Sequence, residues 1–439
     1  MRSLLLTFVF AYLMFLGFSF PFIAGLGYVW ADILKPQSIA YSIINNVPIS
    51  FIAAIFVVSL YFLKDRKHAP NFTLVMFLIL FFACWITLTT FMSDLPELPK
   101  HKWDWALKVL IFALIIPYIF RTRVQIEALL LIIIFSVSTV IFSAAVKTAL
   151  GSGGYGVLAV LGGESNNSGL SESSTLAAIS VMILPLIEYM RYNSLIFKTS
   201  KPVRLLFLGL MACVLLTVIG TSARTGVIAM AVLLLRYIIR SKRKYVWVGL
   251  ILASLVVLQS IDLQSTSWGQ RMNTIQTYDQ DSSAMGRIKV WAWTIEYASE
   301  HPIGGGFNSF RFNRIKTVTD EGIIYYPDYM YHGKAFHSIY FEVLGEQGFV
   351  GFTVYMLILI LTWRGLSNIA KQGKRDEGLG WAYELSIRLK DALLIFMVGG
   401  AFIGIAYQPY VFYVIAITVS LEQYLRRYMK IKQTNVAAM

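Results

Sequence analysis

Apolar runs long enough to cross a membrane recur along this chain from one end to the other, and they constrain its fold more than any other feature. Of the 439 residues, 57% are hydrophobic and only 14% are charged, whereas about 25% of the residues in an ordinary soluble domain are charged. Many of the runs could cross roughly 30 Å of hydrocarbon as helices. Because no stretch has the composition of a separate soluble domain, the sequence predicts one all-α polytopic membrane domain over residues 1–439.

Basic residues predict how these helices alternate across the membrane, because short loops rich in Lys and Arg stay in the cytoplasm. Links of that composition lie at residues 64–67, 121–123, 191–204, 240–244, 364–390 and 426–430. The links between them, which are poorer in basic residues, lie at 93–102, 151–173, 221–222, 262–336 and 407–409. We therefore expect about twelve transmembrane helices with both chain ends inside, at residues 3–31, 44–63, 71–92, 104–120, 125–148, 174–191, 204–220, 225–239, 245–260, 338–363, 391–406 and 409–428.

The first of these runs, residues 3–31, is longer than one crossing requires. It contains Gly17, Pro21, Gly25 and Gly27, and helices kink at such residues. We expect one kinked crossing, and a short re-entrant pair of helices is the alternative.

The net charge of +14 would suit a nucleic-acid-binding protein, but basic residues in the short loops of one side serve to orient a membrane protein. We expect no nucleic acid partner. Cys84 and Cys213 each lie inside an apolar run, which indicates small buried side chains rather than a disulfide or a metal site. Asp279 and Asp281 resemble an acidic metal-binding pair, but Asp is common for local reasons just before a helix. We expect no metal and no cofactor.

One link on the outer side, residues 261–337, is far longer than a connection requires, and loops of this size usually carry function. We interpret it as a catalytic loop with short helices of its own, inserted between the ninth and tenth spans. Residues 282–295 predict one of those helices, which Ser282 or Ser283 would cap. The glycine triplet at residues 304–306 permits a close backbone approach or forms a simple turn.

Two arginines on the outer side are candidates for binding an anion. Arg224 lies at the outer mouth of the predicted eighth span, where an arginine opposes the charge bias and is costly unless it meets a partner such as a phosphate. An arginine that extends to the membrane interface is the simpler interpretation. Arg287 lies one turn before Trp291, which could fix its side chain, although interfacial helices normally carry basic residues.

His337 is the candidate general base. It stands at the outer N-terminus of the predicted tenth span, where the helix dipole disfavours the imidazolium and lowers the pKa of the ring. A histidine that only caps a helix is the simpler interpretation. His301 and His332 are the other histidines placed outside.

Several motifs together resemble the O-antigen ligase and O-antigen polymerase superfamily, over roughly the second half of the chain. They are Ser222 to Gly226, Gly286-Arg287 with Trp291, His301 to Gly306, and His337-Ser338 with Glu342, Glu346 and Gly348. The first half, with Lys35-Pro36-Gln37, resembles the branch of O-glycosylation ligases associated with exosortase systems.

This resemblance implies an inverting, metal-independent glycosyl transfer on the periplasmic face of a bacterial inner membrane. The donor would be a glycan on undecaprenyl diphosphate, and the acceptor in O-antigen ligation is a lipid A–core sugar or another glycan. Membrane lipid would surround the chain. By the same resemblance, Arg224 and Arg287 would bind the donor diphosphate and His337 would act as the base.

Three other functions are compatible with parts of the sequence. A polymerase of the same superfamily would join repeat units to each other and is barely distinguishable by sequence. A transporter of lipid-linked oligosaccharides usually has internal repeats and charges near the midplane of the membrane. This sequence shows no repeat, and most of its predicted spans are free of charge through their middles. A purely structural membrane protein would leave Arg224, His337 and the glycine triplet unexplained.

Overall fold

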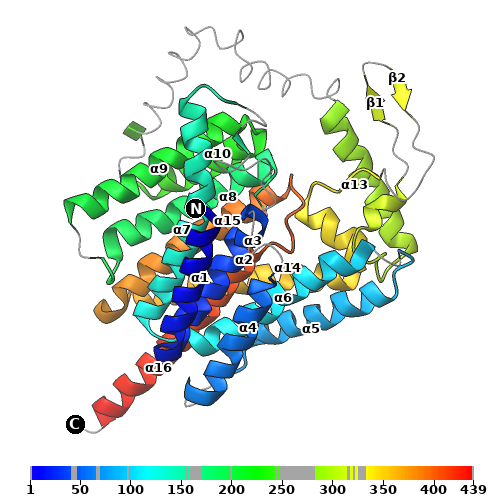
Figure 1. Cartoon of the computed structure of the whole chain (residues 1–439). Helices are drawn as coiled ribbons and strands as arrows, with labels where there is room; N and C mark the ends of the chain where they lie inside the picture. Colours follow the sequence, from blue (N-terminus) through cyan, green and yellow to red (C-terminus); the bar gives the residue numbers. More distant parts are fainter. Residues whose placement is uncertain are drawn as a thin grey trace.

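The computed structural model of the chain describes residues 2–40, 47–65, 70–95, 98–153, 157–158, 170–197, 200–242, 245–246, 282–313, 317–319, 322–324 and 333–437. Apart from one short antiparallel hairpin, the regular structure among these residues is helical (Figure 1). The helices are α1 (Arg2–Ser19), α2 (Pro21–Leu34), α3 (Pro36–Ile39), α4 (Ile49–Leu60) with the π-helical turn η1 (Tyr61–Asp65), α5 (Leu74–Phe91), α6 (Leu98–Ile119), α7 (Arg123–Ala149), α8 (Ser173–Asn193), α9 (Lys201–Thr221), α10 (Arg224–Arg240), α13 (Ser282–Glu300), η3 (Ser309–Phe312), α14 (Ile339–Gly373), η4 (Glu377–Leu379), α15 (Gly380–Gly400) and α16 (Pro409–Ala437), and the strands are β1 (Thr317–Thr319) and β2 (Gly322–Ile324).

Length and apolar composition allow five of the described helices to cross a membrane, namely α5, α7, α8, α9 and α14. This confirms a polytopic helical membrane protein. The predicted ninth span, 245–260, lies almost wholly outside the described residues, as do parts of the links 151–173 and 262–336. The count of about twelve spans therefore stays a prediction.

The first apolar run does not form one kinked crossing. Phe20 is extended (φ −130°, ψ 93°) and Pro21 begins a new helix, because proline suits the first helical position and cannot continue the preceding ladder. A Cβ atom added at Gly17 would lie 2.6 Å from the Cβ of Ala24, and one added at Gly27 would lie 3.2 Å from the Cβ of Leu13. Residue 17 of α1 thus lies beside residue 24 of α2, and residue 13 lies beside residue 27. The two helices therefore form an antiparallel pair, as the alternative prediction has it.

The cysteine prediction is wrong at one of the two positions. Cys84 is exposed on α5, whereas Cys213 on α9 is partly buried, and both are free thiols. An apolar run in a membrane protein has a side that faces lipid, so an apolar neighbourhood in the sequence does not fix burial.

The basic links meet at one end of the helix bundle. Arg121 forms an ion pair with Asp65, and Nη2 of Arg427 donates to the carbonyl oxygen of Arg121 over 2.6 Å. Farther along the chain, Arg240 donates from Nη2 over 2.8 Å to Asp391, a carboxylate with no exposed side-chain surface. Segments that the charge bias predicts to share one side are thus bonded to one another or to the helices beside them.

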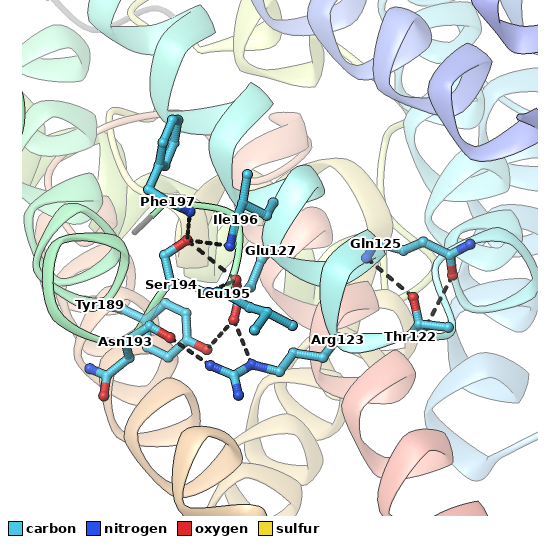
Figure 2. Close-up of polar contacts among 10 residues, drawn as sticks. All are labelled: Thr122, Arg123, Gln125, Glu127, Tyr189, Asn193, Ser194, Leu195, Ile196 and Phe197. Atoms are coloured by element: carbon cyan, nitrogen blue, oxygen red, sulfur yellow. Dashed lines mark hydrogen bonds and ion pairs between the residues drawn. The ribbon is translucent and has the colours of Figure 1, made fainter. Parts of the chain in front are cut away.

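A buried carboxylate on α7 organises this same end of the bundle (Figure 2). Glu127, which has no exposed surface, accepts hydrogen bonds from Arg123 Nε at 2.8 Å, Tyr189 OH at 3.0 Å and the Leu195 backbone N–H at 2.6 Å. This buried carboxylate ties the start of α7 to the chain just after α8, and Arg123 Nη2 donates over 2.6 Å to the carbonyl oxygen of Asn193, one of the groups without an intrahelical partner at the end of α8.

The opposite end of the bundle carries α13 and the β1–β2 hairpin, far from the C-terminus of α16 (Figure 1). There Ser93, after α5, donates from Oγ to the carbonyl oxygen of Gly305 over 2.9 Å. Links that are poorer in basic residues thus contact one another at this end, where the predicted catalytic loop joins the bundle.

Candidate active site

A break in α14 is built around Gly348. Its φ of 64° lies in the left-handed region and interrupts the helical backbone between the segments on either side, a conformation that glycine adopts without a Cβ penalty. A Cβ added there would lie 2.1 Å from the carbonyl oxygen of Pro302. The position therefore requires glycine both for its backbone angle and for its close neighbour.

The glycine triplet satisfies the backbone groups that this break frees. Gly305 N–H donates to the carbonyl oxygen of Gly345 at 3.1 Å, and Gly306 N–H donates to that of Glu346 at 2.9 Å. In return, the N–H of Phe349 donates to the carbonyl oxygen of Pro302 at 3.0 Å. Of the two roles considered for the triplet, close backbone approach is the one observed.

Lys102 bridges two carboxylates of the segment of α14 before the break. Its Nζ atom lies 2.7 Å from Oε1 of Glu342 and 2.7 Å from Oε1 of Glu346. The same Nζ lies 5.0 Å from the ring centre of Tyr407 and 5.5 Å from that of Phe307. Two carboxylates and two aromatic rings thus hold this cation in a mostly dry site.

His337 directly precedes the N-cap of α14, Ser338, and has a left-handed backbone (φ 46°). Its neighbour Phe336 is buried, with a carbonyl oxygen that accepts from Trp291 Nε1 at 2.9 Å. The Trp291 ring in turn stacks on Phe341, with 5.1 Å between ring centres. A helix of the long loop thereby fixes the backbone that presents the histidine.

Burial lowers the pKa of His337 from its ordinary value, and the nearby positive charge of Arg287 lowers it further. Glu172 acts in the opposite direction, with Oε1 at 4.0 Å from Nδ1 of the ring. The direction of the shift is the one that the sequence predicts, although burial and Arg287 are its leading causes. A neutral imidazole at neutral pH can accept a proton.

Arg287 and Lys334 place positive charge beside the histidine. Arg287 lies on α13, whose observed range confirms the predicted helix over 282–295. Gly286 leaves room for Lys334, since a Cβ at this glycine would lie 1.7 Å from Nζ of the lysine. Both cations lower the pKa of His337, so this part of the site favours an anionic ligand.

Arg224 is the first residue of α10 and is partly buried. Gly226, two residues later, packs on α8, where an added Cβ would lie 2.7 Å from the Cβ of Ala177. Glu172 is the N-cap residue of α8. Arg224 and Glu172 therefore lie at the same end of two adjacent helices.

The other two histidines that the charge bias predicts to lie outside differ from His337. His301 is exposed at the end of α13, where it stacks on Tyr297 with 4.3 Å between ring centres. His332 lies outside the described residues, as do Asp279 and Asp281.

A pocket of about 140 Å³ opens beside His337. Its lining combines charged side chains with aromatic rings and one glycine: Lys102, Glu172, Phe310, Ala335, Phe336, His337, Glu342 and Gly404. The carboxylates of Glu172 and Glu342 are hydrogen-bond acceptors suited to hydroxyl groups, and the histidine can take a proton from one.

The sequence did not single out Lys102 as a site residue. Its signal is the same as that of Arg224: a basic residue in a link that is predicted to lie outside, just before an apolar run, where the charge bias disfavours it. Glu172, in the link before α8, carried no comparable signal.

Two family models match the chain, and together they cover most of it. Residues 1–195 match a family of unknown function (DUF5935), and residues 207–356 match the O-antigen ligase family. No curated protein matches the chain. The second match contains Arg224, Arg287 and His337, and the family is associated with glycosyl transfer of the ligase or polymerase type. The resemblance that the motifs indicate is therefore confirmed: residues 207–356 match the O-antigen ligase family and support the O-antigen ligase superfamily.

Proposed function

We propose that this protein transfers a glycan from undecaprenyl diphosphate to an acceptor sugar at the periplasmic face of the bacterial inner membrane. The transfer inverts the anomeric centre and uses no metal, and the acceptor in O-antigen ligation is lipid A–core. The observation that carries the proposal is the position of His337, a histidine with a lowered pKa that lines a pocket between carboxylates and cations.

In this proposal, His337 removes the proton from the acceptor hydroxyl as the oxygen attacks the anomeric carbon. The new C–O bond forms as the bond to the diphosphate breaks, and undecaprenyl diphosphate leaves as an anion. General-base catalysis of this kind contributes about 10²–10⁴-fold in rate. Because the diphosphate is a stable leaving group, no protonated carboxylic acid of the glycosidase type is needed.

Arg287 and Arg224 would bind the diphosphate of the donor. A guanidinium can donate two parallel hydrogen bonds to phosphate oxygens, and fixed cations stabilise the charge that develops on the leaving group. The cationic surroundings of His337 support this role for Arg287. Arg224 is assigned through its place in the family motif and its position beside the start of α8.

Residues 261–337, which include α13 and the β1–β2 hairpin, would form the periplasmic catalytic loop between the ninth and tenth spans. The single membrane domain would span residues 1–439 around it. A polymerase that adds repeat units to a growing glycan is the alternative within the superfamily, and a transporter of lipid-linked glycan is a more distant one.

Purified protein supplied with undecaprenyl-diphosphate-linked glycan and separate acceptors tests the proposal. Mass analysis of the products identifies the bond that has formed. A glycosylated lipid A–core supports the ligase, and an extended lipid-linked glycan supports the polymerase. Donor carried across a vesicle membrane without any new covalent product would replace the enzyme with a transporter.

A further inference from the structure

Glu172 and His337 approach each other from the two halves of the chain. Nδ1 of the ring lies 4.0 Å from Oε1 of the carboxylate, and both side chains line the same pocket. Glu172 belongs to residues 1–195 and His337 to residues 207–356, which match different families. The proposed transfer uses the histidine and assigns no role to this carboxylate.

The other oxygen of Glu172 is held by its own helix. Oγ1 of Thr175, a buried residue of α8, donates to Oε2 over 3.0 Å. Glu172 is the N-cap residue of α8, but its side chain makes no capping hydrogen bond, although side-chain oxygens at this position commonly cap the helix. Thr175 thus orients the carboxylate, and Oε1 is the oxygen that faces the histidine.

Both kinds of charge surround the ring of His337. Two cations lower its pKa and two carboxylates raise it. These groups come from α13, from the chain before α14, from the N-terminus of α8 and from α14, and they are, in that order, Arg287, Lys334, Glu172 and Glu342. Burial and the cations prevail, so a proton that the ring gains during transfer needs a nearby anion.

Glu342 is the less suitable of the two carboxylates, because the fold already holds both of its oxygens. Oε1 lies 2.7 Å from Nζ of Lys102, and Oε2 accepts from the N–H of Ala406 at 2.9 Å. Its side chain is 7% exposed, against 46% for Glu172. Glu172 has room to close the short distance to Nδ1, and catalytic hydrogen bonds are often long until substrate binds.

We propose that Glu172 is a positioning residue for the general base: its carboxylate accepts a hydrogen bond from Nδ1–H of His337 and leaves Nε2 to take the proton of the acceptor hydroxyl. This inference rests on the proposed function, in which His337 is the base. As the acceptor proton moves to Nε2, the ring becomes a cation whose other proton stays on Nδ1, beside the carboxylate. The proton on Nε2 then passes to water. A carboxylate in this place fixes the tautomer of the base and stabilises the imidazolium.

NMR of the histidine rings tests this pair without any substrate. The full chain, with ¹⁵N-labelled histidine, is placed in lipid nanodiscs, and the signals of His337 are identified by their absence in His337→Asn. The neutral native ring should carry its proton on Nδ1, and Glu172→Ala should weaken this preference. Glu172→Gln should lower the pKa of His337, because it removes a negative charge that raises that pKa.

Product assays separate positioning of the base from binding of the donor. The kcat of Glu172→Gln should fall by roughly 10- to 100-fold, less than the 10²–10⁴-fold expected for loss of the base itself. KM for the donor should hardly change, and the acidic limb of the pH profile should move to lower pH. Glu172→Asp, which keeps the charge, should recover part of the activity. Thr175→Val should show a smaller defect, because the carboxylate loses the bond that orients it.

Glu296→Gln is the matched control, since this exposed glutamate of α13 does not line the pocket. It should leave the kcat and the pKa of His337 unchanged. Glu172 is half exposed, and ion pairs of this kind contribute little to stability. Glu172→Gln should therefore also keep the native melting temperature, which separates positioning from a structural role.

Two results would overturn the inference, and they are distinguishable. If the tautomer and the pKa of His337 stayed the same in the Glu172 variants, the carboxylate would not position the ring. Normal transfer by folded His337→Ala would instead remove the proposed base, and with it the role of Glu172, even where the NMR spectra show the pair.

Discussion

Lys102, near the start of α6, holds Glu346 on α14 with 2.7 Å between Nζ and Oε1, and the carboxylate has no exposed side-chain surface. The lysine lies within residues 1–195 and the glutamate within residues 207–356, which match different families. The active-site segment of α14 is thus held by a cation from the other half of the chain.

Replacement of Lys102 by Met should destabilise the protein by about 3–5 kcal/mol, because it leaves buried carboxylates without their counter-charge. Lys102→Arg should recover part of that loss. Thermal unfolding in detergent measures both. Lys432→Met is the control: its ion pair with Asp376 has an exposed lysine, so the melting temperature should hardly move. An unchanged melting temperature in Lys102→Met would show that the bridge contributes nothing to stability.

His337→Ala should bind the donor nearly as well as the native protein and lose transfer by about 10²–10⁴-fold. In the native protein, activity should fall as the pH drops through the pKa of His337, because protonation removes the base. Since that pKa is below its ordinary value, the fall should come at lower pH than for an unperturbed histidine. The product assay at a series of pH values measures this.

His301→Ala is the matched control for that experiment, since the charge bias predicts that this exposed ring also lies outside, where it stacks on Tyr297. It should transfer at close to the native rate. If His301→Ala lost activity while folded His337→Ala retained it, the base would have to be reassigned.

Arg287→Ala should weaken donor turnover more than Arg287→Lys, because lysine keeps the charge and loses the paired hydrogen bonds. The loss in the Ala variant should exceed about 10²-fold if the contact strengthens in the transition state. Arg224→Ala and Arg224→Lys should follow the same order. Normal turnover of the donor by both folded Ala variants would exclude the diphosphate assignment.

Gly348→Ala should destabilise the protein by roughly 2–6 kcal/mol, through the left-handed backbone and the clash with Pro302. Gly209→Ala on α9 is the control, because an added Cβ there meets nothing within 4 Å. It should be neutral or stabilising by up to about 1 kcal/mol. Equal melting temperatures for the two variants would contradict the conclusion that the break in α14 requires glycine at position 348.

Single cysteines at Glu300 and Arg375, both exposed, should be labelled from opposite sides of the membrane. The background would carry Cys84→Ala and Cys213→Ala. The charge bias of the links predicts that Glu300 is reached from the periplasm and Arg375 from the cytoplasm. A membrane-impermeant thiol reagent that labelled both from one side would refute the alternation.

Local signals in the sequence predict the helical membrane class, the α13 helix and the place of His337 just before a helix. They succeeded because hydrophobic runs, caps and charge bias act over a few residues. The partners of Glu342 and Glu346 were out of reach, because Lys102 is separated from them by more than half of the chain. From the sequence, the first run could form either one kinked helix or two helices, because proline permits both. The close packing of Gly17 on Ala24 accompanies the form with two helices, divided at Phe20.

Three of the bonds that hold the break in α14 come from backbone groups of residues 302, 305 and 306, and these three do not depend on the side chains at those positions. Substitutions at Ile303, which is 40% exposed, should therefore be tolerated. Gly304 and Gly306, with φ of 92° and 76°, should not tolerate a residue with a Cβ atom. Among related chains this stretch should vary at one position and stay fixed at its neighbours, a pattern imposed by the shape of the loop rather than by its reactivity.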